Sequence, residues 1–213
     1  RDKQPRAFVL ENVKGMQTYK ESLGDSPLNV LKGMLADCGY NVHATLLNAY
    51  KHGGLPQNRE RYFFVGYRKD IPININQVLQ EIPCTQPYQA YLEQSCIPNK
   101  YYYYEKKRPR LAWAFKYLNE YAKLKDCGDY VYQIRNSSYS VRQHKVKGRC
   151  PALIKRMGTG GNEVPLIYEP ESCKWRKLTP RECLNLQGYP SNFPMSPKIS
   201  DAAYYRMAGN SIP

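Results

Sequence analysis

The fold class is clearest in the segment Ala7-Phe8-Val9-Leu10-Glu11-Asn12-Val13-Lys14-Gly15. Four consecutive apolar residues, without polar alternation, are typical of a strand that is buried on both faces in a parallel sheet. An acid and an amide follow, and then a glycine. Because ligands bind beyond the carboxyl ends of the strands in open α/β sheets, we expect Glu11 to face a binding site.

The position of Glu11 suggests a chemical role for its carboxyl group. Burial disfavours the charged form of a carboxyl group, so a partly dehydrated Glu11 is expected to keep its proton. A neutral carboxylic acid can donate a hydrogen bond or a proton near pH 7. The alternative is an acid at a turn or helix start after a core strand, and this segment alone does not distinguish the two.

The first 70 residues predict half of an α/β sheet. Ser26 and Pro27 form a helix start, with a capping hydroxyl followed by proline at the first helical position. Apolar residues at helical spacing follow, and Gly39 ends the run. Strands are expected around 42–47 and 62–67, separated by a glycine-rich turn. The order strand, helix, strand, turn, strand indicates one α/β unit.

Two arginines stand at the entry to the last of these strands. Arg59 and Arg61 alternate along the chain after Gln57, so their side chains are expected to point the same way. Two guanidinium groups directed at one edge suit phosphate or carbonyl oxygens. A salt-bridge ladder with Glu60 or a neighbouring strand is the alternative.

Charge and composition favour a nucleic-acid partner. The 213 residues carry a net charge of +14, and the segment 100–181 holds 19 Lys/Arg against 7 Asp/Glu. No apolar run approaches the roughly 20 residues of a membrane span, and no secretory signal is visible. The seven scattered cysteines form no CxxC pair, which predicts free thiols in a reducing cytoplasm and no metal site.

The second half predicts a connector and then short strands. Residues 71–100 have few periodic features, 111–122 carry a helical stripe, and 130–168 contain short β-like runs with turn residues. The glycine-rich loop 157–162 suits contact with a DNA groove, or is a simple β-turn. A capping box at Thr179 begins one helix, and Ser200 caps another.

Four segments, in order, resemble motifs of the C5-cytosine DNA methyltransferases of bacterial restriction-modification systems. They are Glu11-Asn12-Val13, then Gln57 with Arg59 and Arg61, then Arg176 to Cys183 continuing to Gln187-Gly188-Tyr189-Pro190, and finally Gly209-Asn210-Ser211. The resemblance spans nearly the whole chain, with a basic variable stretch between the second and third motifs.

The resemblance implies an α/β fold in two parts. One is the second half of a doubly wound, Rossmann-like methyltransferase sheet, and the other is a smaller, mostly β or irregular target-recognition domain. The expected domains are a partial catalytic domain over 1–82, the target-recognition domain over 83–174, and a return to the catalytic domain over 175–213.

The resemblance also implies a reaction and its residues. In this family a cysteine thiolate adds to carbon 6 of a cytosine flipped out of the duplex, and carbon 5 then attacks the methyl group of S-adenosylmethionine. Glu11 matches the acid at N3 of the base, Arg61 the arginine near O2, and Arg59 its neighbour. Asn210 and Ser211 match cofactor-binding positions. The residues expected to bind DNA are Gln57, Arg142, Arg149, Thr159, Gly160 and Gly161.

One departure from the family is large. The family's glycine-rich cofactor loop and Pro-Cys nucleophile precede the Glu-Asn-Val motif, and this sequence contains neither; Pro83-Cys84 falls in the connector. We therefore expect a partial S-adenosylmethionine site, and an enzyme piece that is inactive alone.

The expected partners follow from the same resemblance. They are double-stranded DNA, a separate N-terminal half or subunit that carries the nucleophile, and a cognate restriction endonuclease acting on the same site. The alternatives are a non-catalytic, sequence-specific DNA-binding module and, less favoured, an enzyme acting on RNA.

Overall fold

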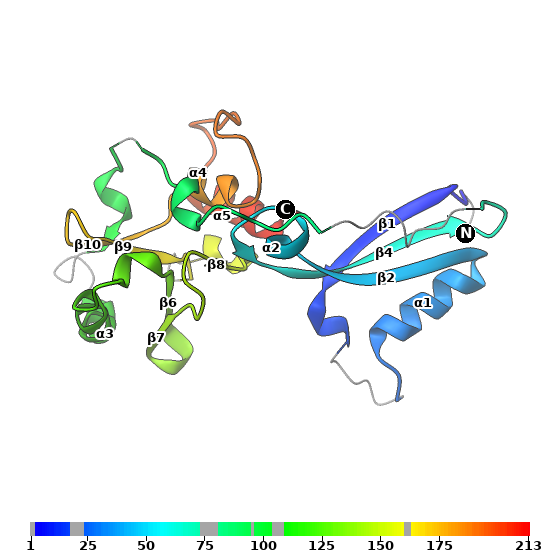
Figure 1. Ribbon diagram of the computed structural model, residues 1–213, viewed down its shortest axis with the longest axis horizontal. Helices are drawn as coiled ribbons and strands as arrows, with labels where there is room; N and C mark the ends of the chain where they lie inside the picture. The colour runs from blue at the N-terminus through cyan, green and yellow to red at the C-terminus, as the bar shows by residue number, and fades with distance from the viewer. Residues whose placement is uncertain (1–2, 18–23, 73–80, 95, 104–108, 160–162) are drawn as a thin grey trace.

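A computed structural model describes residues 3–17, 24–72, 81–94, 96–103, 109–159 and 163–213. The molecule is elongated, with a three-stranded sheet at one end and a five-stranded sheet at the other. The C terminus lies between them (Figure 1).

The first sheet is antiparallel, with strand order β1-β4-β2. Its strands are β1 (Ala7–Val13), β2 (Tyr40–Asn48) and β4 (Glu60–Arg68), and β4 runs antiparallel to both neighbours. Strands β1 and β2 therefore run in the same direction, and α1 (Pro27–Asp37) is the crossover that joins them. The predicted helix start is confirmed, since the Ser26 side chain accepts from the Asn29 amide.

The prediction that β1 is buried on both faces is wrong for this chain. Val9 is 65% exposed, Leu10 41% and Val13 50%. A run of apolar residues predicts a strand, but it does not show what packs against the two faces of that strand. The neighbour of β1 in the sheet is the antiparallel strand β4, whereas a parallel neighbour was predicted. One row of β4, which includes Tyr62 and Phe64, is buried, whereas the opposite row is only half-buried.

A close approach explains one glycine of this sheet. The Phe8 ring lies over Gly66 of β4, where an added Cβ would come within 2.1 Å of the ring. The same ring packs edge-on against Tyr40 of β2, with centroids 5.1 Å apart. The three strands are thus joined by aromatic packing that only glycine allows.

The second sheet has the order β5-β10-β9-β6-β7. Helix α3 (Ala112–Ala122) packs against it through Ala114, Phe115 and Leu118, of which Phe115 and Leu118 belong to the predicted helical stripe. The strands are β5 (Tyr102–Tyr103), β6 (Tyr132–Arg135), β7 (Ser140–Gln143), β9 (Leu166–Glu169) and β10 (Lys174–Lys177).

Short elements connect the two ends. Strand β3 (Gln57–Asn58) pairs in parallel with β8 (Cys150–Pro151), which joins the two halves of the chain. The remaining α-helices are α2 (Ala49–His52), α4 (Pro180–Asn185) and α5 (Asp201–Asn210). The 3-10 helices are Lys14–Gln17, Tyr88–Tyr91, Asn99–Tyr101, Pro109–Leu111, Cys127–Asp129, Asn136–Ser138 and η9 (Lys155–Gly158).

The main core lies in the middle of the molecule. Residues of α4 and α5 pack there with Cys150, Leu153 and Met157. Helices α4 and α5 therefore share a core with the predicted recognition domain rather than with the three-stranded sheet. Strand β10 spans the predicted boundary at residue 175 and belongs to the five-stranded sheet.

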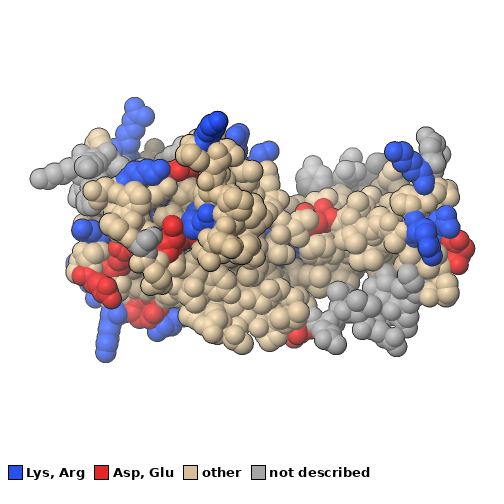
Figure 2. Space-filling model, turned by 90° about the horizontal axis from the view of Figure 1, so that it is seen from above, with Lys and Arg blue, Asp and Glu red and all other residues tan. Residues whose placement is uncertain are grey.

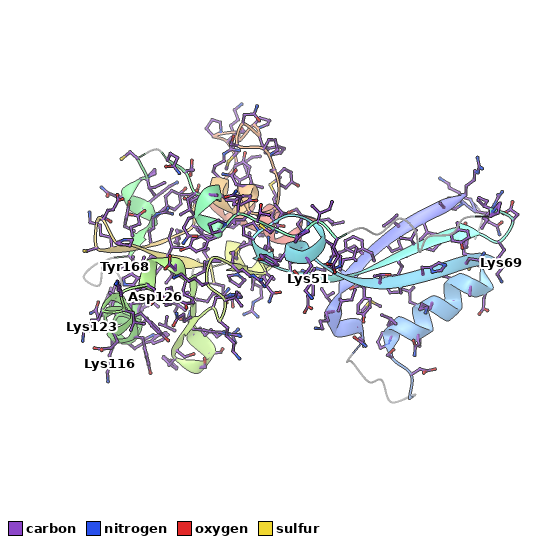
Figure 3. All side chains as sticks on the ribbon, in the orientation of Figure 1. Lys51, Lys69, Lys116, Lys123, Asp126 and Tyr168 are labelled. Carbon is purple, nitrogen blue, oxygen red and sulfur yellow. The ribbon has the colours of Figure 1, made fainter. Side chains whose placement is uncertain are left out.

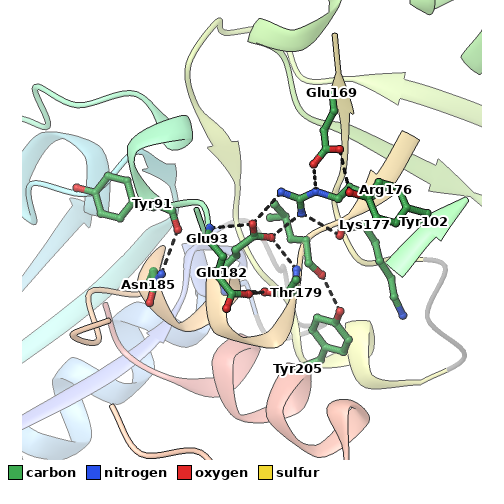
Figure 4. Close-up of polar contacts among 11 residues, drawn as sticks. Tyr91, Glu93, Tyr102, Glu169, Arg176, Lys177, Thr179, Glu182, Asn185 and Tyr205 are labelled. Carbon is green, nitrogen blue, oxygen red and sulfur yellow. Dashed lines mark hydrogen bonds and ion pairs between the residues drawn. The ribbon is translucent and has the colours of Figure 1, made fainter. Parts of the chain in front are cut away.

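A buried polar network joins this sheet to α4 (Figure 4). The Arg176 side chain is 2% exposed and donates to both oxygens of Glu182, each at 2.8 Å. Arg176 also pairs with Glu169 at 2.5 Å. Glu182 and Thr179 form the predicted capping box, which is confirmed. A structural role follows for Arg176 and Glu182, because each charge is paired inside the fold.

Positive charges occur along the length of the molecule. On the face drawn in Figure 2, Lys and Arg side chains gather towards the two ends. Figure 3 places Lys69 at the tip of the three-stranded sheet, Lys51 near the middle, and Lys116 and Lys123 on α3. Within the described ranges, no helix has the length and apolarity needed to cross a membrane.

Candidate active site and recognition segment

The candidate site lies at one edge of the three-stranded sheet. Strands β1 and β2 end at this edge and β4 begins there, because β4 runs in the opposite direction. The register pairs Val13 with Arg61 and Leu47 with Arg61 across the two interfaces. Glu11 of the first motif and Arg61 of the second are thereby brought together.

Glu11 and Arg61 form an ion pair. The Arg61 Nε lies 2.7 Å from the Glu11 Oε1, with side-chain exposures of 16% and 24%. Arg61 also donates to the Glu60 carbonyl at 2.8 Å, and Lys14 pairs with the Glu60 carboxylate at 2.9 Å. One oxygen of the Glu11 carboxyl group therefore faces the Arg61 guanidinium in this structure.

A cavity of about 90 Å³ opens beside Arg61. Apolar side chains of β2 and β4 form part of its wall. The polar side chains of Asn48, His52, Arg59 and Arg61, together with Pro213, contribute to the rest. Its lining residues are Leu47, Asn48, Ala49, His52, Gly53, Arg59, Arg61, Phe63 and Pro213. The pairing of apolar surface with a few converging polar groups is typical of small-molecule sites.

Arg59 does not point toward Glu11. It is 3% exposed and donates to three backbone carbonyls: Leu153 at 2.6 Å, Gly209 at 3.1 Å and Ser211 at 3.0 Å. Burial, and then the charge of Arg61, lower the pKa of Arg59 to about 10, while Glu11 opposes this shift. Both Nη atoms are occupied by the backbone, which does not fit the predicted catalytic role.

Gln57 is also buried, with no exposed surface. Its Oε1 accepts from the Leu153 amide at 3.1 Å, and its Nε2 donates to the Leu186 carbonyl at 3.0 Å. The predicted contact between Gln57 and DNA does not fit this burial, because both ends of the amide are already bonded inside the protein.

The end of α5 lies next to the arginines. Asn210 is exposed, and the Ser211 hydroxyl donates to the Ala208 carbonyl at 2.8 Å. Arg59 binds the carbonyls on either side of Asn210, and Pro213 lines the cavity beside Arg61. Asn210 is not among the residues that line the cavity, although Pro213, three positions later, is.

The other predicted DNA-binding residues lie on the second half of the chain. Arg142 is exposed on β7, and Thr159 is exposed after η9. The Arg149 guanidinium lies 3.3 Å from the centroid of the Tyr50 ring, so part of its donor capacity faces an aromatic ring rather than solvent. Gly160 and Gly161 lie outside the described residues.

His144 lies between these two arginines in the sequence. Burial lowers the pKa of His144, and the charges of Arg142 and Arg149 add to that effect. The imidazole therefore adds little positive charge to this surface near neutral pH.

Sequence reasoning missed two backbone positions that organise the site. Leu153 is the partner of both Gln57 and Arg59, and Gly209 lies against Ile154 and Lys155, where an added Cβ would come within 2.4 Å of backbone atoms. The presence of a glycine in the last motif could have predicted the close approach at Gly209. No sequence signal could have predicted the role of Leu153, because its backbone groups, and not its side chain, make the contacts.

Solved structures identify the fold as that of the methyltransferases. The chain superimposes on the S. pombe Dnmt2 methyltransferase with a TM-score of 0.64 and 16% identity, covering 98% of this chain and 61% of that one. For the Entamoeba histolytica methyltransferase EhMeth the TM-score is 0.61 and the identity 17%, covering 98% and 58%. The predicted Rossmann-like methyltransferase fold is confirmed.

The chain belongs to the family described as C-5 cytosine-specific DNA methylase, whose profile matches residues 1–213. It is 33% identical over 219 residues to the type II methyltransferase M.Bsp6I of Bacillus sp. (strain RFL6), covering 99% of this chain and 62% of that protein. It is 26% identical to M.HpaII of Haemophilus parainfluenzae, covering 98% and 57%. The chain therefore spans about three fifths of these relatives.

Proposed function

We propose that the chain is part of a DNA (cytosine-5)-methyltransferase of a restriction-modification system. The observation that carries this proposal is the Glu11–Arg61 pair at the carboxyl edge of the sheet, beside an apolar-walled cavity. The enzyme flips one cytosine out of double-stranded DNA and methylates its carbon 5. S-adenosylmethionine, when bound, supplies the methyl group.

The two paired residues hold the flipped base. The Glu11 carboxyl group donates a hydrogen bond to N3 of the cytosine, and Arg61 donates to O2, where negative charge develops as the ring is attacked. Their mutual contact fixes the orientation of both groups before the base arrives, which reduces the cost of reorganisation. Asn210 and Ser211, at the end of α5, are the proposed cofactor-binding residues.

The nucleophile comes from protein outside these 213 residues. Of the described cysteines, Cys84 follows a proline, but it is buried and its thiol donates to the Gln86 carbonyl at 3.1 Å. Val9 and Val13, on one face of β1, are 65% and 50% exposed, which supports a further covering layer on that face, since exposed apolar patches mark interaction surfaces. We infer that the chain is inactive until that part is supplied.

DNA is bound mainly by the basic second half. The proposed contacts are Arg142, Arg149, Thr159, Gly160 and Gly161. The cognate endonuclease recognises the same DNA sequence in the cytoplasm. Affinity for a duplex should fall steeply as salt rises, because each phosphate contact releases counterions. A salt-independent affinity would contradict this part of the proposal.

The test is reconstitution. The chain is joined to, or mixed with, the remaining polypeptide of the enzyme, and transfer of labelled methyl groups to duplex DNA is measured against the chain alone. Transfer only in the reconstituted enzyme supports the proposal. Intact DNA binding without transfer would favour a non-catalytic DNA-binding module, and transfer to RNA in preference to DNA would replace the substrate.

A further inference from the structure

Both backbone groups of Leu153 are bound by side chains from one short segment. The Leu153 amide donates to the Gln57 Oε1 at 3.1 Å, and its carbonyl accepts from the Arg59 Nη1 at 2.6 Å. All three residues are 3% exposed or less. A residue held at both backbone groups by buried side chains has little freedom to shift, because each lost bond leaves a buried group unpaired.

Other contacts fix the same place. Strands β3 and β8 pair in parallel, Gln57 with Cys150 and Asn58 with Pro151, immediately before Leu153. On the far side, α5 lies so close that a Cβ on Gly209 would come within 2.2 Å of the Ile154 carbonyl carbon. Arg59 binds the Gly209 carbonyl at the same time, so one guanidinium joins α5 to Leu153.

The residues after Leu153 form an arch that is anchored at both ends. Leu153 and Met157 are buried at 0% and 1%, whereas Ile154 is 37% exposed and Lys155 and Arg156 are exposed. We call residues 153–157 the recognition arch. Arg156 pairs with Glu163 at 3.0 Å, whereas the Lys155 ammonium pairs with no group among the described residues. Within the part of the chain that the structure describes, the arch therefore presents Lys155 as an unpaired cation between two buried residues.

The arch is also connected to the candidate active site. Arg59 directly precedes β4 and Arg61 is its second residue, so the two are roughly 7 Å apart along an extended chain. Arg59 holds the arch while Arg61 holds Glu11. A shift of the arch would therefore also displace Arg59 and, through the backbone, Arg61.

We propose that Gln57 and Arg59 are positioning residues that hold the recognition arch in register with the Glu11–Arg61 pair and so set which bases around the target cytosine are accepted. Lys155 is the side chain that the arch presents to the duplex. This inference rests on the proposed function, because it concerns the sequence preference of that same site.

The first experiment measures sequence preference. The reconstituted enzyme methylates a duplex library with randomised positions around one cytosine, and bisulfite sequencing gives the preference profile. Gln57→Leu should reduce discrimination by about tenfold at one or more positions, the size expected for losing a buried hydrogen bond. Lys155→Met should change the profile at fewer positions. An unchanged profile in both variants would overturn the proposal.

A matched control separates positioning from stability. Gln89 also donates to a part-buried carbonyl, that of Gly128 at 3.2 Å, and makes no hydrogen bond to the arch among the described contacts. Gln89→Leu should lower the melting temperature without changing the profile. Should Gln57→Leu fail to fold, Gln57→Glu, which keeps the acceptor for Leu153, and Arg59→Lys provide the comparison. Equal profile changes in Gln89→Leu and the Gln57 variants would contradict a specific positioning role.

A second measurement does not depend on catalysis. Hydrogen exchange of the Leu153 amide should be slow in the unmodified protein, faster in Gln57→Leu and close to normal in Gln57→Glu. If the unmodified enzyme methylates no DNA while this exchange pattern holds, the proposed function fails and the backbone contact stands. Equal exchange rates in all three proteins would overturn the positioning role itself.

Discussion

The two ends of the molecule differ in how completely they bury their own apolar surface. In the three-stranded sheet, Val9, Leu10 and Val13 remain exposed. In the five-stranded sheet, Tyr132, Ile134 and Trp175 are buried under α3. The second end is therefore complete as a packed unit, whereas the first displays the Glu11–Arg61 pair on a surface that further protein can cover. The two ends of the molecule therefore differ in how much apolar surface they leave exposed.

The largest effect is expected at the exposed end. In the reconstituted enzyme, Glu11→Gln should lower the methylation rate by about 10²- to 10⁴-fold, the range for losing a group that exchanges protons with the substrate. Arg61→Ala should be similarly harmful. Glu60→Gln is the matched control, because Glu60 pairs with Lys14 rather than with the site. An undiminished rate in Glu11→Gln would remove Glu11 from the chemistry.

The next effect is expected at the packed end. Arg176→Met should lower the free energy of unfolding by roughly 3–5 kcal/mol, since it leaves the Glu182 carboxylate buried without its partner. Chemical denaturation measures the change. Arg68→Met removes an exposed pair with Asp70 and should cost less than about 1 kcal/mol. Similar losses in the two variants would contradict the difference between buried and exposed pairs.

A smaller effect separates the middle of the molecule from the first end. Gly209→Ala should destabilise by about 1–3 kcal/mol, because the added methyl group meets the backbone of Ile154 and Lys155. Gly33→Ala in α1 has open space at the Cβ position and should stabilise by roughly 0.5–1 kcal/mol through helix propensity. Thermal unfolding of the two variants should therefore shift in opposite directions.

The smallest effect concerns pH. Burial alone would raise the pKa of Glu169, but the hydrogen bond and the charge of Arg176 outweigh it and lower the pKa below its ordinary value. The stability that ionised Glu169 contributes is therefore present above its ordinary pKa and is lost as the pH falls through the lowered value. Unfolding curves of the unmodified protein and of Glu169→Gln should converge at low pH. A constant difference between them at all pH values would contradict this assignment.

The sequence predicted most of the local structure. Capping residues and apolar spacing placed α1, α4 and α5, and the Glu-Asn-Val and Gln-x-Arg-x-Arg motifs placed Glu11 and Arg61 at one site. Alternation along a strand suggested that Arg59 and Arg61 act together. That inference was incomplete, because side-chain direction does not reveal whether solvent or another part of the chain lies in front of each residue.

The amino-acid sequence by itself determined the family, the helix starts, the basic second half and the identity of the acid and the arginine at the site. These properties depend on residue type and short spacing, which local physical chemistry is sufficient to interpret. Only the tertiary structure decided that β4 runs antiparallel between β1 and β2, and that Gln57 and Arg59 hold Leu153. Those contacts join residues 94 and 96 positions apart through backbone groups, which carry no sequence signal.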